Sequence, residues 1–291
     1  MTYEFAKEAP AIIGYKEYAR RAMADFEQLL KTDASEETKF QRFFECNPGF
    51  MPGARDEFDF LGPSGHSPYL DVLIAQPKIS GLISRFPDFM WLASDSVYFT
   101  PVIIEIEAPS KKYFNKDGKP SSSFLQARHQ LEEWQMILSR PENVMTFYRD
   151  FSIPEELREL NFRPHFVLIY GRREEYKSNK LLTQKRAVLI NSEQTVMSYD
   201  RIKPQIGDGC VCCNVKDGEY NARALCPTFS IGPMKSELLK VKNLVQAVDN
   251  TDYLEEERRI FLKERIPYWL DYLRAGTEAD FKNDGEYQWE E

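Results

Sequence analysis

The chain has 291 residues, of which 42% are hydrophobic and 29% are charged. These proportions exclude a disordered polymer and favour a globular protein that buries a sizeable core. The chain contains no apolar run as long as a membrane span, and its N-terminus lacks the basic start and apolar stretch of a secretory signal. We therefore expect a cytoplasmic protein with no membrane partner.

The net charge of −8 is unusual for a protein that binds nucleic acid, because phosphate neutralisation dominates such binding. The charge is unevenly distributed, however. Residues 278–291 hold six acids and one lysine, a local charge of −5 that leaves −3 for the rest of the chain. A local basic surface could therefore still bind DNA.

Five cysteines in a long chain without an export signal favour reduced thiols over a disulfide framework. Cys210 and Cys213 form a CxxC pattern, with Cys212 between them and Cys226 further on. A structural zinc site needs four ligands, and neither a second pair nor a nearby histidine completes this one. We expect free thiols packed in a hairpin.

Hydrophobic periodicity predicts a helix at 14–31 and a second helix through 37–45, which the Asn47-Pro48-Gly49 turn ends. Residues 50–68 are rich in Pro, Gly and Ser and are predicted to form a loop. Three strand-like runs follow, at 69–75, 84–93 and 96–108.

A polar, basic loop at 110–123 precedes a predicted helix at 124–138. Further predicted elements are strands at 165–171, 185–190 and 195–199, a hairpin at 210–225, and helices at 234–248 and 252–274. This order divides the chain into an N-terminal helix (1–32), a core (33–206), a β-hairpin plus helical C-terminal region (207–275) and an acidic tail (276–291). The fold class is α/β, with a mixed sheet flanked by helices and a C-terminal helical extension.

Two glutamates stand in the most apolar of these strands. Successive strand residues point to opposite faces, so Glu105 and Glu107 share a face while Ile104 and Ile106 share the other. Two like charges in a covered strand are costly unless a positive group offsets them. A divalent cation such as Mg²⁺, which prefers oxygen ligands, is the simplest such partner.

Asp88 adds a third carboxylate within the apolar run before this strand, and an antiparallel pairing would bring it close to Glu105. The carbonyl of Ile106 offers a further oxygen. A metal held there lowers the pKa of bound water and stabilises charge on an attacked phosphate. A single ExE pattern is as often an exposed, salt-bridged face. The order of PD, ExE and a helix carrying Gln130 and Trp134 strengthens the catalytic interpretation.

The same residues resemble a known family, the Shedu anti-phage immune nucleases. The pattern consists of E-T-K-F-Q-R-F-F-E-C-N-P at 37–48, P-D-F at 87–89, I-E-I-E-A-P at 104–109 and A-R-H-Q-L-E-E-W at 127–134. Two later runs, V-L-I-Y-G-R-R at 167–173 and S-Y-D at 198–200, look like the family's downstream strand and Tyr-Asp element. The resemblance covers about residues 35–205.

The resemblance implies a restriction-endonuclease-like core of the PD-(D/E)xK type, Mg²⁺-dependent cleavage of DNA, homo-oligomerisation as a dimer or tetramer, and bacterial defence against phage. Mn²⁺ is expected to substitute for Mg²⁺. Carried over by residue, Asp88 and Glu105 become the metal-binding acids, Glu37 an additional helical acid, and Gln130 the helical glutamine near the site.

Glu107 departs from the family pattern, which places a lysine two residues after the second acid. Glu107 could itself bind metal, orient the attacking water or act as base, as in some ExE restriction enzymes. Alternatively, Lys111 or Lys112 could reach back and supply the missing charge. A third alternative is a degenerate site that binds DNA without cutting it.

The expected function is therefore a metal-dependent endonuclease that hydrolyses phosphodiester bonds of double-stranded DNA. The alternatives are a catalytically silent DNA-binding or sensing module and an interaction protein with a structural metal site. Backbone phosphates are expected to contact Lys111, Lys112, Lys116, Arg172 and Arg173. The helices at 234–248 and 252–274 either form a subunit interface or cover the sheet of their own subunit.

Overall fold

The computed structural model describes residues 9–54, 66–81, 84–188, 194–204, 210–232 and 235–275. The described strands are β1 (Val72–Ala75), β2 (Phe89–Ser94), β3 (Tyr98–Ile106), β4 (Asn161–Phe162), β5 (His165–Ile169), β6 (Gln194–Met197), β7 (Val211–Lys216), β8 (Glu219–Leu225) and β9 (Val241–Lys242). They form one mixed sheet in the order β6-β5-β3-β2-β1-β7-β8-β9, and β4 pairs with one end of β3. This confirms a mixed α/β fold.

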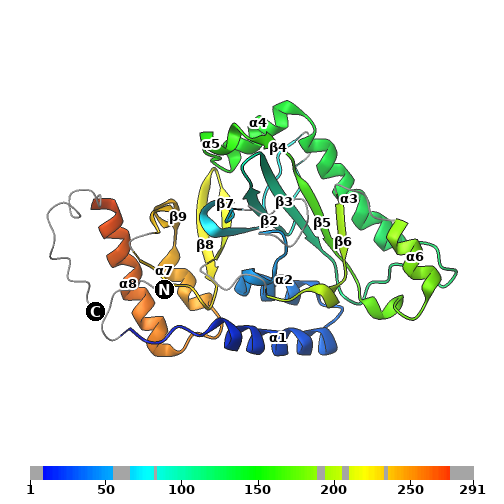
Figure 1. The fold of residues 1–291 in the computed structure, drawn as a ribbon, viewed down its shortest axis with the longest axis horizontal. Coiled ribbons are helices and arrows are strands. Elements are labelled where there is room, and N and C mark those ends of the chain that lie inside the picture. Colours follow the sequence, from blue (N-terminus) through cyan, green and yellow to red (C-terminus); the bar gives the residue numbers. More distant parts are fainter. Residues whose placement is uncertain are drawn as a thin grey trace.

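The helices of the described residues are α1 (Tyr15–Thr32), α2 (Glu37–Cys46), α3 (Ser122–Leu138), α4 (Pro141–Asp150), α5 (Glu155–Arg158), α6 (Lys180–Val188), α7 (Leu244–Ala247) and α8 (Glu256–Ala275). α1 and α2 lie beneath the sheet in the view of Figure 1, α3 and α4 lie on its other side, and α8 stands beside the β7–β8 hairpin. No helix in these ranges is long and apolar enough to cross a membrane.

Strand β3 lies in the interior of the sheet, between β2 and β5, as its apolar sequence predicts. It runs antiparallel to β2, with Phe89 opposite Ile104, and parallel to β5. Ile104 and its alternate neighbours pack against α1 and α2, whereas Ile103 packs in the core that contains α3. Because side chains alternate along a strand, Glu105 belongs to the α3 side of the sheet.

The C-terminal part extends this sheet. The predicted hairpin at 210–225 is confirmed as β7 and β8, and β7 pairs with β1 in parallel. Leu238, Leu244 and Val248 are buried in the same core as residues of β8 and α8. The apolar stripe predicted between 234 and 248 therefore covers the sheet of its own chain.

Two predicted elements are wrong. The run at 185–190 is not a strand: α6 continues to Val188, and residues 189–190 lie outside the described ranges. The Arg186 guanidinium of α6 lies over two aromatic rings. It is 5.2 Å from the centroid of Tyr113 and 5.0 Å from the centroid of Tyr176, and these contacts hold the helix in place. A short apolar run does not distinguish helix from strand when such contacts decide its conformation.

The predicted helix at 234–248 is also wrong. The described part forms a 3₁₀ turn at Ser236–Lys240, then β9, then the short α7. Asn243 adopts a left-handed conformation with φ 63°, which interrupts any continuous helix, and Val241 pairs with Tyr220 of β8. The next helix begins at Glu256 rather than 252, and the acidic tail at 276–291 lies outside the described residues.

Candidate functional site

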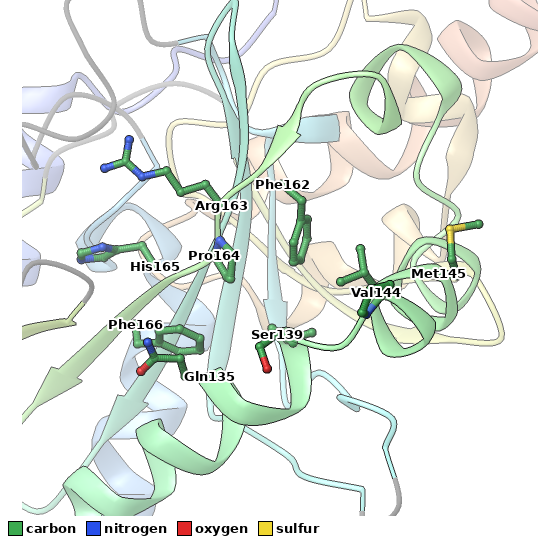
Figure 2. A pocket seen from close by; sticks show the side chains of 11 residues that line it. Gln135, Ser139, Val144, Met145, Phe162, Arg163, Pro164, His165 and Phe166 are labelled. Atoms are coloured by element: carbon green, nitrogen blue, oxygen red, sulfur yellow. The ribbon is translucent and has the colours of Figure 1, made fainter.

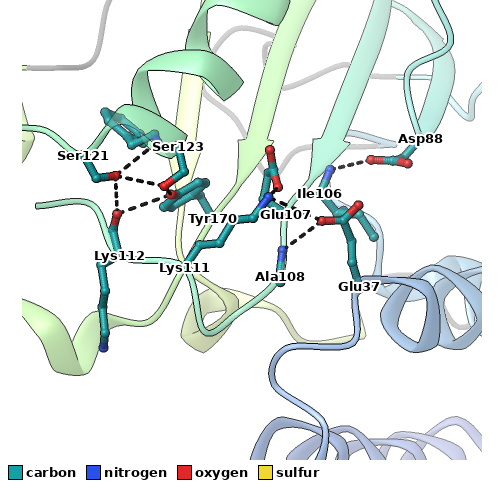
Figure 3. A network of polar contacts seen from close by, with 11 residues as sticks. Glu37, Asp88, Ile106, Glu107, Ala108, Lys111, Lys112, Ser121, Ser123 and Tyr170 are labelled. Carbon is teal, nitrogen blue, oxygen red and sulfur yellow. Dashed lines mark hydrogen bonds and ion pairs between the residues drawn. The ribbon is translucent and has the colours of Figure 1, made fainter.

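Four carboxylates gather where β3 ends. Asp88 immediately precedes β2, Glu105 lies on β3, Glu107 follows β3, and Glu37 begins α2. The Ile106 amide donates to Asp88 Oδ2 at 2.9 Å, and the Ala108 amide donates to Glu37 Oε2 at 3.2 Å (Figure 3). These two bonds attach both remote acids to the segment that carries Glu105 and Glu107.

Asp88, which is half-buried, and Glu105, which is buried, form one half of the cluster. Glu105 is 9% exposed, and its Oε2 atom has no hydrogen-bond partner in the described part of the chain. Burial, followed by the charge of Asp88, raises the pKa of Glu105 well above its usual range. Burial raises the pKa of Asp88 to about 6, although the bond from the Ile106 amide acts in the opposite direction. The pair therefore resists carrying two negative charges unless a cation joins it.

Glu107 and Glu37 form the other half, and here the chain supplies a cation. Lys111 Nζ contacts Glu107 Oε2 and lies 3.8 Å from Glu37 Oε2. Burial and the charge of Glu107 raise the pKa of Glu37 to about 7. Of the two lysines that could replace the family's lysine, the structure brings Lys111 to the cluster.

A polar network holds the loop that carries Lys111 (Figure 3). The Tyr170 hydroxyl contacts Ser123 Oγ at 3.0 Å and donates to the Lys112 carbonyl at 3.3 Å. The Ser121 hydroxyl donates to the same carbonyl at 2.6 Å, and its oxygen caps α3 by accepting from Phe124 N. The loop after β3 is thus fixed to the end of β5 and the start of α3.

Gly171 permits this close approach. It has a φ of 57°, and a Cβ there would lie 2.7 Å from the Lys111 carbonyl oxygen. Glu175 accepts from the amides of Tyr113 and Phe114 at 2.9 Å each. Sequence reasoning missed Tyr170, Ser121 and Glu175 as supports of the site. Gly171, two residues after the buried strand β5, was the sequence signal that another segment approaches the backbone closely here.

The chemistry of these donors fits a hard divalent cation. No group of three or more His, Cys, Asp or Glu side chains within the described ranges is arranged to hold a metal ion. Mg²⁺, however, commonly binds proteins through only one or two carboxylates, with water and substrate phosphate completing its shell. Asp88 and Glu105 supply that number, and the unpartnered Glu105 Oε2 is a buried oxygen ready to accept a cation.

The remaining predicted site residues are less closely connected to the carboxylates. Gln130 is half-buried on α3 and makes no hydrogen bond to them among the described residues. Lys112, Lys116 and Arg173 are exposed, as DNA contact requires. Arg172, in contrast, is bound to Asp200 at 2.9 Å, which leaves Arg173 as the more available of the two arginines.

The thiols take no part in the site. All five cysteines are free and buried, which confirms the prediction of packed thiols. His129 is exposed on α3, with Nδ1 3.6 Å from Glu132 Oε2.

A cavity of about 700 Å³ lies elsewhere, between the end of α3, the start of α4 and the β4–β5 connection. Figure 2 shows apolar side chains such as Phe162 and Val144 around it, and Arg163 and His165 also belong to its lining. His165 lies at the start of β5, whereas Glu105 pairs with Leu168 near its end. The cavity has no acid in its lining and is separate from the carboxylates.

The fold and the cluster define a mixed α/β protein with buried acids at the end of its central strand. Residues 34–202 match the family model for the Shedu protein SduA, C-terminal. The match covers more than half of the chain, and the chain belongs to this family, as the sequence motifs indicated. It includes all four carboxylates and Lys111, and it ends before the β7–β8 hairpin. No curated protein sequence matches the chain.

Proposed function

We propose that the chain is a metal-dependent endonuclease that hydrolyses phosphodiester bonds of double-stranded DNA in the bacterial cytoplasm. Family membership supports a role in anti-phage defence. The strand order around β3 and the flanking helices are compatible with a restriction-endonuclease-like, PD-(D/E)xK core. The observation that carries the chemistry is the buried Glu105 carboxylate beside Asp88, whose Oε2 accepts no hydrogen bond from an N–H or hydroxyl group in the described part of the chain.

Asp88 and Glu105 would hold Mg²⁺, for which Mn²⁺ can substitute, together with the Ile106 carbonyl. Both carboxyl groups have raised pKa values because burial penalises their charged forms, and a cation removes that penalty. When bound, the ion would lower the pKa of water and stabilise the charge of the attacked phosphate.

Glu107 and Lys111 complement this pair. Glu107, whose Oε2 contacts Lys111 Nζ, would accept a proton from the attacking water, and Lys111 Nζ would donate to a phosphate oxygen. Glu37 borders both groups and, with its pKa raised to about 7 by burial and by Glu107, can retain a proton near neutral pH. Glu107 would thus act in proton transfer or as a third metal ligand, and Lys111 would supply the charge of the family's lysine.

Exposed cations near the carboxylates would contact the DNA backbone. Lys112 and Lys116 belong to the same loop as Lys111, and Arg173 follows β5 on the far side of Gly171. Such contacts position a duplex without reading its sequence. They also reconcile DNA binding with the net charge of −8, because the contacting surface is local.

The decisive experiment is incubation of the purified chain with supercoiled plasmid in Mg²⁺, in Mn²⁺ and in EDTA. We expect nicked or linear products only with metal, and none from the Glu105→Gln variant. Binding of labelled duplex without cleavage by the wild-type chain would replace the nuclease by a silent DNA-binding module. If the wild-type chain neither binds nor cleaves DNA, the remaining alternative is an interaction protein with a structural metal site.

A further inference from the structure

A second cavity, of about 290 Å³, opens between the end of α4, the β7–β8 turn and the residues that follow β1. Its charged lining residues are Lys78, Arg149, Asp150, Lys216 and Asp217. Three cations against two acids give this hollow a net positive charge in a chain whose own net charge is −8. A concave positive site of this kind favours an anion.

Two of these cations are available to a ligand. Asp150 is satisfied at both oxygens, because Arg149 binds Oδ1 at 2.7 Å and the Ser80 hydroxyl donates to Oδ2 at 2.7 Å. Lys78 and Lys216 are exposed and have no ion pair in the part of the chain that the structure describes. With Arg149 and Asp150 paired, Lys78 and Lys216 outweigh Asp217 and give the cavity its net positive charge.

The β7–β8 turn fixes the position of Lys216. Asp217 and Gly218 both have positive φ, 52° and 78°, as a tight two-residue hairpin turn requires. A Cβ on Gly218 would lie 2.2 Å from Ser152 Oγ, so the turn packs closely against the residues after α4. The Tyr220 hydroxyl donates to the Phe151 carbonyl at 2.7 Å and anchors the second strand there.

The chain also ties this cavity to the carboxylates. The Gln76 amide donates to the Asp88 carbonyl at 2.8 Å, and Lys78 follows only two residues later. Two residues of fully extended chain span at most about 7 Å. Lys78 thus flanks Asp88 from the β1 side, whereas Lys112 and Lys116 come from the loop after β3.

We propose that this Lys78–Lys216 cavity binds a backbone phosphate of the DNA whose neighbouring phosphodiester lies at Asp88 and Glu105. The inference rests on the proposed nuclease function and adds a contact to the same substrate. With cations on both sides of the carboxylates, the duplex is held across the cluster and the phosphate to be cleaved is aligned with it. Residue 216 lies beyond the matched family region, so the hairpin contributes to substrate binding from outside it.

The test uses the full chain with Glu105→Gln, which keeps the DNA intact, and a fluorescein-labelled duplex titrated at several KCl concentrations. Adding Lys78→Gln and Lys216→Gln should weaken binding at low salt by about tenfold or more. The slope of log Kd against log salt should fall by about 0.9, the contribution of one phosphate contact. Lys16→Gln with Lys31→Gln, two exposed lysines of α1, is the control with the same charge change and should leave the slope unchanged.

The carbonyl end of α4 also attracts cations, so the lysines could serve stability alone. Thermal unfolding of each variant separates the two roles. A lower Tm with an unchanged salt slope overturns the inference and leaves the nuclease proposal intact, because the parent variant still binds DNA. Failure of the parent and the wild-type chain to bind any duplex overturns both.

Discussion

Lys111 Nζ contacts the carboxylate of Glu107, four residues before it in the chain. The Lys111 amide donates to the Ala108 carbonyl at 3.0 Å, so a tight turn after β3 returns the lysine to the strand end. A cation is therefore present beside the acids even though Glu107 occupies the position of the family's lysine. This geometry favours the alternative in which the lysine has moved along the chain while its charge is retained.

Neutral, isosteric replacements of the buried pair should abolish cleavage without unfolding the chain. We expect Asp88→Asn and Glu105→Gln each to lower the rate of plasmid cleavage by about 100-fold or more, because each removes a carboxylate that we propose as a metal ligand. The Tm in EDTA should not fall for Glu105→Gln, since a buried, unpartnered carboxylate is removed. Near wild-type cleavage by either variant would show that the reaction does not use this pair.

Lys111 should contribute more to the cleavage rate than Lys112. Lys111→Met is expected to lower the cleavage rate by roughly 100-fold, because it removes the charge beside Glu107. Lys112→Met is the matched control: its side chain is exposed, and a loss of only a few-fold is expected. Equal losses in the two variants would indicate that both lysines only bind the DNA backbone.

Glu107 has two possible roles that substitution can separate. Glu107→Gln should lower cleavage severely if its carboxylate accepts a proton or binds metal. Glu107→Lys restores the usual family arrangement and should keep or raise activity. If Glu107→Gln is harmless while Lys111→Met is damaging, then Lys111 alone performs the role assigned to the pair.

Metal binding should strengthen with rising pH. The pKa values of Asp88 and Glu37 are raised to about 6 and about 7, above their ordinary 3.8 and 4.5. At pH values between the ordinary and the raised pKa of each group, the folded chain holds more protons than the unfolded chain. In the absence of metal, the stability of the folded chain therefore falls as the pH rises through this window. Mn²⁺ competes with those protons, and its stabilising effect should therefore grow over the same window. Thermal unfolding with and without Mn²⁺, at about pH 5.5 and about pH 8, measures this. A Tm gain that is independent of pH, or that persists in Glu105→Gln, would place the ion elsewhere.

The sequence allowed the central strand and its acids to be predicted, because alternation along an apolar strand relates Glu105 to Glu107 directly. The approach of Asp88 followed from antiparallel pairing of adjacent strands, which the register confirms. These are local relationships of period and order. They require no knowledge of how distant segments fold onto the sheet.

The supports of the site depend on distant segments and were not predictable in this way. Tyr170 contacts Lys112, which is 58 positions away in the chain, and Glu175 reaches the amide of Tyr113 across 62 positions. Sequence alone likewise could not distinguish Lys111 from Lys112, because the turn at Ala108 decides which side chain returns to the cluster. Short apolar runs such as 185–190 failed for a related reason, since tertiary contacts determine their conformation.

Self-association is the last prediction, because two cuts across a duplex need two active sites and one chain carries one. Of the two segments expected at a subunit interface, the one at 234–248 is not available, because its apolar residues Leu238, Leu244 and Val248 are buried within the chain. Helix α8 retains exposed apolar residues: Ile260 is 50% exposed and Tyr268 is 45% exposed. They lie eight residues apart, about two helical turns, and so can contribute to one surface.

We therefore expect the chain to form dimers or tetramers through this face of α8. Ile260→Glu should shift the mass measured by light scattering at micromolar concentration towards the 34.0 kDa monomer. Leu181→Glu is the matched control, because Leu181 is exposed on α6, and it should leave the mass unchanged. Loss of duplex cleavage with retained nicking in Ile260→Glu would connect assembly to the second cut. A wild-type mass that stays at the monomer value with DNA and Mg²⁺ present would contradict self-association altogether.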